Sequence, residues 1–274
     1  MVHLERIRIR PVASLDAISV SERTLVDRGP AWERRYTIVE RTPGSDARPA
    51  PVTAEREPRL RRLETTYDLE RETVTIRERG SDETATFHLD LDRECFASWL
   101  SEFLGYSVEI VRTDESGGPS AAVPSGPTVV SAETLETVAE WYDEIDADEL
   151  CRRVQPTLVV GGAPPFWEDR LYGRADRIVP VEVGSTTLYG TAPSQLRGLS
   201  ARDPETGAQT DGFRETFVER RRATLPDWAT AVRFDHYFRL LSETRVPQAS
   251  VGTTLSVDEP VTVGEPVPSP TPAD

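Results

Sequence analysis

Apolar and polar residues alternate in several segments of the first 91 residues, with the period of two that is typical of β-strands. Leu4, Ile7 and Ile9 are the apolar positions of the first segment, residues 3–12. The other segments predicted as strands are residues 35–40, 59–67, 73–78 and 84–91. Clusters of Pro, Gly, Ser and Asp separate these segments and supply turns. Many short strands joined by turns predict a small β-barrel or sandwich.

A helical period replaces the alternation over residues 92–104. The apolar side chains recur at positions i, i+3, i+4, i+7 and i+8 of one helix face, and they are Phe96, Trp99, Leu100, Phe103 and Leu104. Asp92 can cap the start of this helix and Gly105 its end. We expect the apolar face to pack in a core.

The remainder of the chain mixes short apolar runs with helical patterns. Ser131 can cap a helix that carries Leu135 and Val138, and further helical segments are predicted at residues 147–153 and 212–224. The predicted strands are residues 107–112, 158–161, 178–189, 237–241 and 254–263. Residues 114–127 are rich in Ser, Gly and Pro and predict a loop or linker, while the Pro-rich tail 265–274 predicts disorder.

The composition is strongly acidic, with 32 basic residues against 47 acidic ones and a net charge of −15. All 32 cations are arginines. Acidity without lysine is typical of a halophilic protein, because salt screens the repulsion between surface carboxylates; an acidic protein from a GC-rich genome is the alternative. The charge argues against non-specific nucleic-acid binding. Without a lysine amine, covalent pyridoxal phosphate catalysis is excluded.

Cysteine and histidine show no metal or disulfide pattern. Cys95 and Cys151 lie far apart, and the three histidines, His3, His88 and His236, lack zinc-ligand spacing. No run of 18 apolar residues and no apolar leader segment occurs, so we expect no membrane span and no signal peptide. These features predict a cytoplasmic protein.

The segment at residues 191–207 is the most informative part of the chain. It ends in the sequence DPETG and resembles the signature of the MOSC domain, the C-terminal module of molybdenum cofactor sulfurases. In that family the pattern is roughly P-x-x-R-C-x-x-x-T-x-D-P-x-T-G, and the cysteine sulfur ligates molybdenum. Counting back from Asp203 places Arg197 at the cysteine position. A guanidinium has no lone pair to give to a metal, so the resemblance implies a member that lacks the family's metal ligand.

The resemblance extends over nearly the whole chain. The sequence GAPPFWEDR at residues 162–170 resembles G-x-x-P-F-W-E-D, and RRVQPT at residues 152–157 resembles R-R-F-R-P-N. VTAEREP at residues 52–58 resembles V-T-x-R-x-x-P and leaves Arg56 at the arginine position. The opening turn resembles P-[IV]-K-S-L, in which Ser14 matches and Ala13 replaces the lysine. Since lysine avoidance alone would place an arginine there, the change at Ala13 indicates a weakened phosphate site.

The resemblance implies a mainly β fold with three parts. An N-terminal β-barrel-like domain with one helix occupies residues 1–113, a loop and helical connector residues 114–153, and a C-terminal MOSC β-barrel residues 154–263. A disordered tail follows at 264–274. It also implies the molybdenum cofactor as ligand. The expected cofactor-binding residues are Ser14, Arg56, Arg197 and Thr206, the catalytic candidates are Asp203 and Glu168, and no residue is expected to ligate a metal.

Each candidate also has a purely structural interpretation. Arg197 and Arg56 can bind an anion or form surface ion pairs. Asp203 and Thr206 can serve catalysis, but the D-P-x-T-G sequence is more often turn chemistry. Glu168 offers a carboxylate for acid–base chemistry. Three further expectations are that Trp167 lies in the core, that His236 bonds to Asp235 or to backbone, and that Cys151 is an inert buried thiol.

Two functions therefore remain open from the sequence. The first is a molybdenum-cofactor protein for sulfur transfer or amidoxime-type reduction, with an electron-transfer partner if it is active. The second is a non-catalytic module that binds a small anionic ligand without metal. In both, we expect Arg197 and Arg56 to converge on one cleft, with Glu168 or Asp169 as the carboxylate between them.

Overall fold

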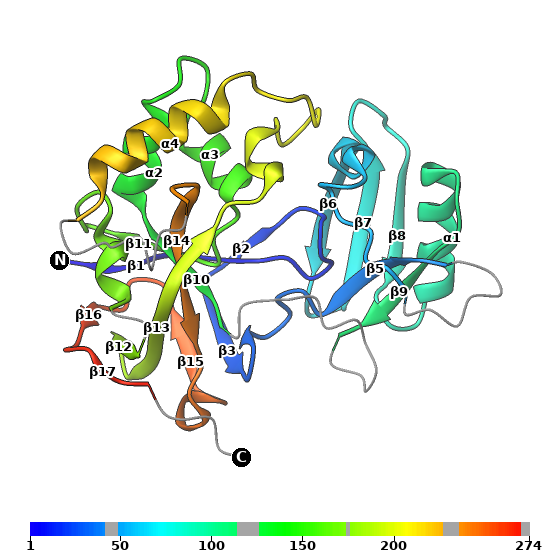
Figure 1. Ribbon diagram of the computed structural model, residues 1–274. Helices are drawn as coiled ribbons and strands as arrows, with labels where there is room; N and C mark the ends of the chain where they lie inside the picture. Colours follow the sequence, from blue (N-terminus) through cyan, green and yellow to red (C-terminus); the bar gives the residue numbers. More distant parts are fainter. Residues whose placement is uncertain (42–48, 114–125, 174–175, 227–235, 270–274) are drawn as a thin grey trace.

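A computed structural model describes residues 1–41, 49–113, 126–173, 176–226 and 236–269, which form two lobes side by side (Figure 1). The small lobe contains residues 32–41 and 49–113, and the large lobe contains most of the remaining described chain. β1 (His3–Ile9) and β2 (Ile18–Val20) form a hairpin that starts in the large lobe. Its tip, residues 11–16, enters the small lobe, where Val12 and Leu15 join the core.

The large lobe is organised around one long sheet. Its strands follow the order β16-β12-β13-β14-β10-β11-β1-β2, and β17 pairs with β12 beside this path. The bounds are β10 Thr128–Ser131, β11 Leu158–Gly161, β12 Arg177–Val183, β13 Thr186–Gln195, β14 Arg239–Arg245, β16 Val261–Val263 and β17 Val267–Pro268. β10 and β11 are parallel, whereas the other pairs are antiparallel. A smaller sheet pairs β15 (Thr254–Ser256), β3 (Glu22–Val26) and β4 (Gly29–Pro30).

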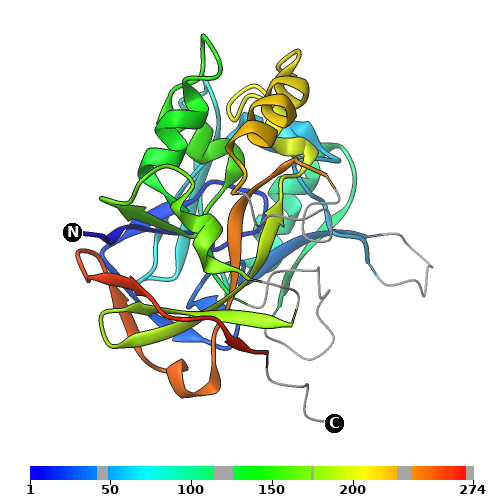
Figure 2. The ribbon, with the colours of Figure 1, turned by 60° about the vertical axis from the view of Figure 1, so that its left-hand side comes forward.

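Three helices cover one face of the large sheet, α2 (Ala132–Ala139), α3 (Ala147–Val154) and α4 (Phe213–Thr224) (Figure 2). The Ser131 hydroxyl caps α2 by accepting a hydrogen bond from the Thr134 N–H. Phe213 and Phe217 of α4 are fully buried and pack edge-on against Phe238. The described part of the large lobe also contains the short 3-10 helices η2 (Trp167–Leu171), η3 (Gly198–Ala201) and η4 (Gln248–Ser250).

The small lobe packs one helix against two short sheets. Its elements are β5 (Tyr36–Glu40) paired with β9 (Val108–Arg112), the sheet β6 (Leu63–Asp68), β7 (Thr73–Glu78) and β8 (Thr84–His88), α1 (Arg93–Leu104) and the 3-10 helix η1 (Pro58–Arg62). Phe96, Leu100 and Leu104 bury the apolar face of α1, and Trp99 and Phe103 are half-buried. Gly105 ends the helix with a φ of 74°, which glycine adopts without strain.

The mainly β fold and the helices predicted from the sequence are confirmed, while several details differ. The predicted strand at residues 59–67 begins as η1, because Pro58 favours a helical first turn. Asp92 makes no side-chain cap to α1; its Oδ2 accepts the His88 N–H instead. In the tail predicted as disordered, Val267 and Pro268 pair with β12. The loop predicted at residues 114–127 lies mostly outside the described residues.

Strand pairing also crosses the predicted domain boundary. β1 belongs to the predicted N-terminal domain, yet it pairs with β11 of the C-terminal half. β3 likewise pairs with β15. The described strands follow open paths and close no barrel. In the same described residues, no helix has the length and apolarity to cross a membrane.

Candidate functional site

Two glycines of the large lobe lie where it contacts the small lobe. The Gly198 N–H donates to Glu55 Oε1 of the small lobe at 3.1 Å. A Cβ atom at Gly198 would lie 2.7 Å from the same oxygen, so a larger residue would displace this contact. Gly207, with a φ of 74°, packs against Pro58 of η1, and a Cβ there would lie 3.2 Å from the Pro58 carbonyl oxygen. Glycine is therefore required for the close approach of the DPETG segment to the small lobe.

Asp203 and Thr206 shape this segment. Asp203 Oδ1 accepts the Glu205 N–H at 2.9 Å, the Thr206 N–H at 2.6 Å and the Thr206 hydroxyl at 2.9 Å. Burial raises the pKa of Asp203, but these hydrogen bonds outweigh it and leave the pKa below its ordinary value. The Asp203 carboxylate thus makes the hydrogen bonds that are typical of a turn. These bonds hold the DPETG segment in the conformation that faces the small lobe.

Arg56 and Arg197 flank the contact between Glu55 and Gly198. Both side chains are exposed, and within the described part of the chain neither guanidinium has a hydrogen bond or an ion pair. Counted from Val52, the arginine of the V-T-x-R-x-x-P pattern falls on Glu55, one residue before Arg56. Glu55, the residue that contacts the large lobe, is therefore a carboxylate where the pattern has an arginine.

The expectation that Glu168 or Asp169 lies between Arg56 and Arg197 is wrong. Both carboxylates are buried in η2, where Glu168 Oε2 accepts from the Thr134 hydroxyl at 2.9 Å and Asp169 Oδ1 from Arg221 Nη2 at 2.6 Å. The carboxylate at the contact between the lobes is Glu55 instead. Burial, followed by the charge of Asp169, raises the pKa of Glu168 to about 8.

A buried group of charges lies where η1 and the hairpin tip face the large lobe. At its centre is Arg61, which is 7% exposed and whose Nε and Nη2 have no hydrogen-bond partner. Asp16, Arg79, Arg153 and Asp203 are the charged groups that act on it. Burial lowers the pKa of Arg61; the positive charges of Arg79 and Arg153 act in the same direction, while the two carboxylates oppose them.

The neighbours of Arg61 are already paired. Arg79 Nη2 lies 3.2 Å from Asp16 Oδ2, and Arg153 Nη2 lies 2.6 Å from Glu149 Oε1. Arg153 Nη1 also donates to the carbonyl of Ser200 in η3 at 3.4 Å. The neighbouring carboxylates therefore leave the two free Arg61 donors without an anionic partner.

A second buried arginine follows β1. Arg10 is 2% exposed, and its Nη1, 3.9 Å from Glu33 Oε1, makes no hydrogen bond. Burial lowers the pKa of Arg10 to about 10 although Glu33 opposes the change. Arg8 Nη1 donates to Cys151 Sγ at 2.6 Å, and this thiol is buried as expected. Ser14, in the hairpin tip, is half-buried and has a φ of 73°, which is uncommon for a residue other than glycine.

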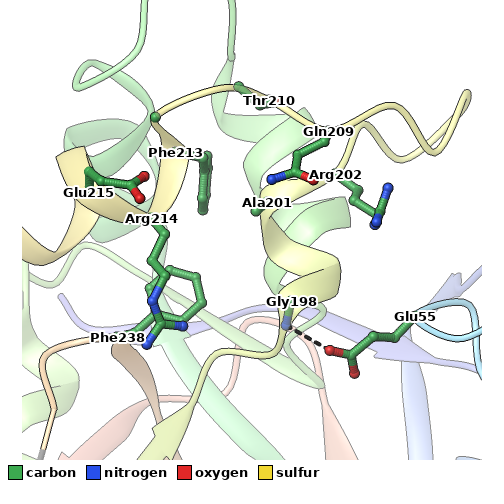
Figure 3. Close-up of a pocket in the computed structure, with 11 residues that line it drawn as sticks. Glu55, Gly198, Ala201, Arg202, Gln209, Thr210, Phe213, Arg214, Glu215 and Phe238 are labelled. Carbon is green, nitrogen blue, oxygen red and sulfur yellow. Dashed lines mark hydrogen bonds between the residues drawn. The ribbon is translucent and has the colours of Figure 1, made fainter.

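An open pocket of about 270 Å³ lies between η3 and the start of α4, with Glu55 at its edge (Figure 3). Phe213 and Phe238 line its inner side, and the Arg214 guanidinium stacks over the Phe238 ring at 4.7 Å. Arg202, also in the lining, donates through Nη1 to the Gly207 carbonyl at 3.0 Å. The pocket therefore has an aromatic inner wall, and its lining carries both positive and negative side chains.

Residues 1–107 match the family model of the MOSC N-terminal beta barrel domain. The chain contains a MOSC N-terminal domain. The match covers the hairpin β1–β2, β3 and β4, and the small lobe as far as the end of α1. No curated protein matches the chain. The resemblance seen in the N-terminal sequence is thereby confirmed.

MOSC proteins are associated with the molybdenum cofactor, and the residues of this chain fit only part of such a group. Arg197, which the sequence resemblance places at the position of the metal-binding cysteine, has no lone pair for a metal. Among the residues that the structure describes, no three His, Cys, Asp or Glu side chains converge as metal ligands. The free donors of Arg10 and Arg61 fit an anionic group such as a phosphate. The described residues therefore include donors that fit an anionic group but no set of side chains that fits a metal ion.

Proposed function

We propose that this MOSC-family protein binds a small anionic ligand between its two lobes and supplies no ligand to a metal. The observation that supports this function best is Arg61, a buried guanidinium with two free N–H donors. A buried donor without a partner costs about 1–3 kcal/mol, and more for a charged group. An anionic oxygen between the lobes would remove this cost.

The chemistry of the site favours a phosphate or a similar oxyanion. Guanidinium groups bind such oxygens through two parallel N–H bonds, and Arg61 Nε and Nη2 lie on one edge of the guanidinium. Arg79 and Arg153 add positive charge to the same region. In a chain of net charge −15, a buried group of arginines is a local exception that an anionic ligand explains.

The family association makes a pterin phosphate, the metal-free anionic part of the molybdenum cofactor, the first organic ligand to test. In that case the predicted C-terminal MOSC domain would complete the site from the large lobe. Sulfur transfer or amidoxime-type reduction, with an electron-transfer partner, is the second candidate function, and the family match is what favours it. The replacement at Arg197 argues against it, because this chain supplies no thiolate at that position.

Thermal unfolding with inorganic phosphate at constant ionic strength tests the proposal. Ligand that binds the folded state stabilises it by about 2.7 kcal/mol at a hundredfold excess over Kd. We expect phosphate to stabilise the wild type and Arg59→Gln, but not Arg61→Gln. Arg59 is the matched control, because it is an exposed arginine of the same 3-10 helix that pairs with Glu57. Equal stabilisation of all three proteins, or of none, would reject the function.

A further inference from the structure

Charged side chains of both signs line the pocket of about 270 Å³ between η3 and the start of α4. They are Arg202, Arg214, Glu55 and Glu215. Among the residues that the structure describes, none of these four side chains forms an ion pair. By contrast, Arg152 and Arg153 of α3 are paired with carboxylates. The pocket therefore gathers positive and negative groups that the protein itself leaves unpaired.

Arg214 and Glu55 reach the pocket from different lobes, and Figure 3 shows them on opposite sides of Gly198. The Arg214 guanidinium lies 4.7 Å from the centre of the Phe238 ring and makes no hydrogen bond within the described chain. Glu55 accepts the Gly198 N–H through Oε1 alone, so its Oε2 is left without a donor among the described residues. Both side chains are exposed, and a ligand can therefore reach them from solvent.

We propose that this pocket binds a small zwitterion whose carboxylate and ammonium groups are separated by a short chain. The carboxylate of the ligand pairs with the Arg214 guanidinium, and its ammonium group pairs with the Glu55 carboxylate. The chain between them lies along the inner wall that Phe213 and Phe238 form. The volume of about 270 Å³ is just below the roughly 300–1,000 Å³ of sites for drug-sized ligands, so the pocket suits a molecule of amino-acid size.

The balance of charge around the pocket favours a zwitterion over a ligand with one charge. An anion attracted by Arg214 is repelled by the carboxylates of Glu55 and Glu215. A cation attracted by these carboxylates is repelled by Arg214 and Arg202. A zwitterion pairs with both signs and adds no net charge to the pocket. This ligand is distinct from the anion proposed at Arg61, which does not line the pocket.

Three probes of one chain length separate these cases: 4-aminobutyrate is a zwitterion, pentanoate is an anion and pentylammonium is a cation. We expect titration followed by ligand NMR, at constant ionic strength, to show 4-aminobutyrate binding about fivefold more tightly than either of the others. This ratio corresponds to about 1 kcal/mol, the upper end for one exposed ion pair. No binding of 4-aminobutyrate, or equal or tighter binding of pentanoate or pentylammonium, would overturn the proposal.

Two substitutions assign the two ends of the ligand. In Arg214→Gln we expect 4-aminobutyrate to bind no more tightly than pentylammonium, and in Glu55→Gln no more tightly than pentanoate. Arg220→Gln is the control, because Arg220 is exposed on α4 outside the pocket lining, and it should keep the fivefold preference of the wild type. A preference that survives in either pocket variant, or that is also lost in the control, would contradict the site. Stabilisation by phosphate should be unchanged in Arg214→Gln, so this proposal and the anion site at Arg61 can fail separately.

Discussion

The buried carboxyl group of Glu168 makes a specific prediction about pH and stability. Glu168 is 0% exposed, and its pKa is raised from 4.5 to about 8, first by burial and then by the charge of Asp169. In the unfolded chain the same group titrates near its ordinary value. The folded state therefore binds this proton more strongly than the unfolded chain does. The resulting contribution of Glu168 to the free energy of unfolding is complete below pH 4.5 and is lost as pH rises to about 8.

Glu168→Gln removes this titration and keeps the side chain's shape. The Gln carbonyl can still accept the Thr134 hydroxyl, and the amide replaces the protonated oxygen. One pKa unit corresponds to about 1.4 kcal/mol, so the free energy of unfolding of the variant relative to wild type should rise by about 2.7 kcal/mol from pH 5 to pH 7. Above pH 8 the difference should level off.

Urea unfolding at constant high salt, at one-unit steps from pH 5 to pH 9, measures this difference. Glu215→Gln is the control, because Glu215 is exposed on α4. Its difference from wild type should vary little with pH. A Glu168→Gln difference that is also independent of pH, or one that falls as pH rises, would refute the account of this buried carboxyl group.

Three further predictions follow from the composition and the core. The melting temperature should rise between 0.1 M and 2 M KCl, because the Debye length falls from about 10 Å at 0.1 M to about 3 Å at 1 M and repulsion among carboxylates is screened; an unchanged or lower value would count against this. Phe217→Ala should cost about 3–5 kcal/mol in urea unfolding, since Phe217 is 0% exposed between Trp141 and Phe238; a loss below 1 kcal/mol would show that the core closes over the cavity. Arg221→Met should cost about 3–5 kcal/mol at pH 7, because Asp169 would be left buried and unpaired, and a neutral or stabilising result would contradict the ion pair's assigned role.

Local signals in the sequence predicted local structure well. The spacing of Phe96, Leu100 and Leu104 identified α1, and Ser131 identified the start of α2. The predicted strand at residues 178–189 is found as β12 and β13, and Gly184, with a φ of 56°, lets the chain turn between them. These features depend on residues near one another in the chain, so periodicity and turn chemistry are sufficient to find them.

The pairings between distant segments could not be predicted in this way. β1 pairs with β11 across more than half of the chain, and no local pattern specifies that partner. For the same reason the strands of residues 1–26 belong to the large lobe although the family match includes them. The predicted domain boundaries, which followed the order of the sequence, stay a prediction.

The sequence also missed the arginines that matter most to the proposed site. Arg10 follows the last residue of β1, and Arg61 was placed in a predicted strand that is a 3-10 helix here. An arginine in such positions is ordinarily a surface residue, whereas both side chains are buried in the folded protein. The sequence indicated Glu168 only as a carboxylate for acid–base chemistry, and its burial depends on η2, which follows the positive φ of Phe166, 60°.

The proposed function has two parts: the protein binds an anion between its lobes, and it supplies no ligand to a metal. The most direct measurement is elemental analysis for molybdenum and phosphorus after gel filtration at high salt, on protein from a host that makes the molybdenum cofactor. We expect little or no molybdenum in wild type and Arg61→Gln, with bound phosphorus present only in the wild type. Molybdenum near one equivalent per chain, surviving gel filtration, would contradict it.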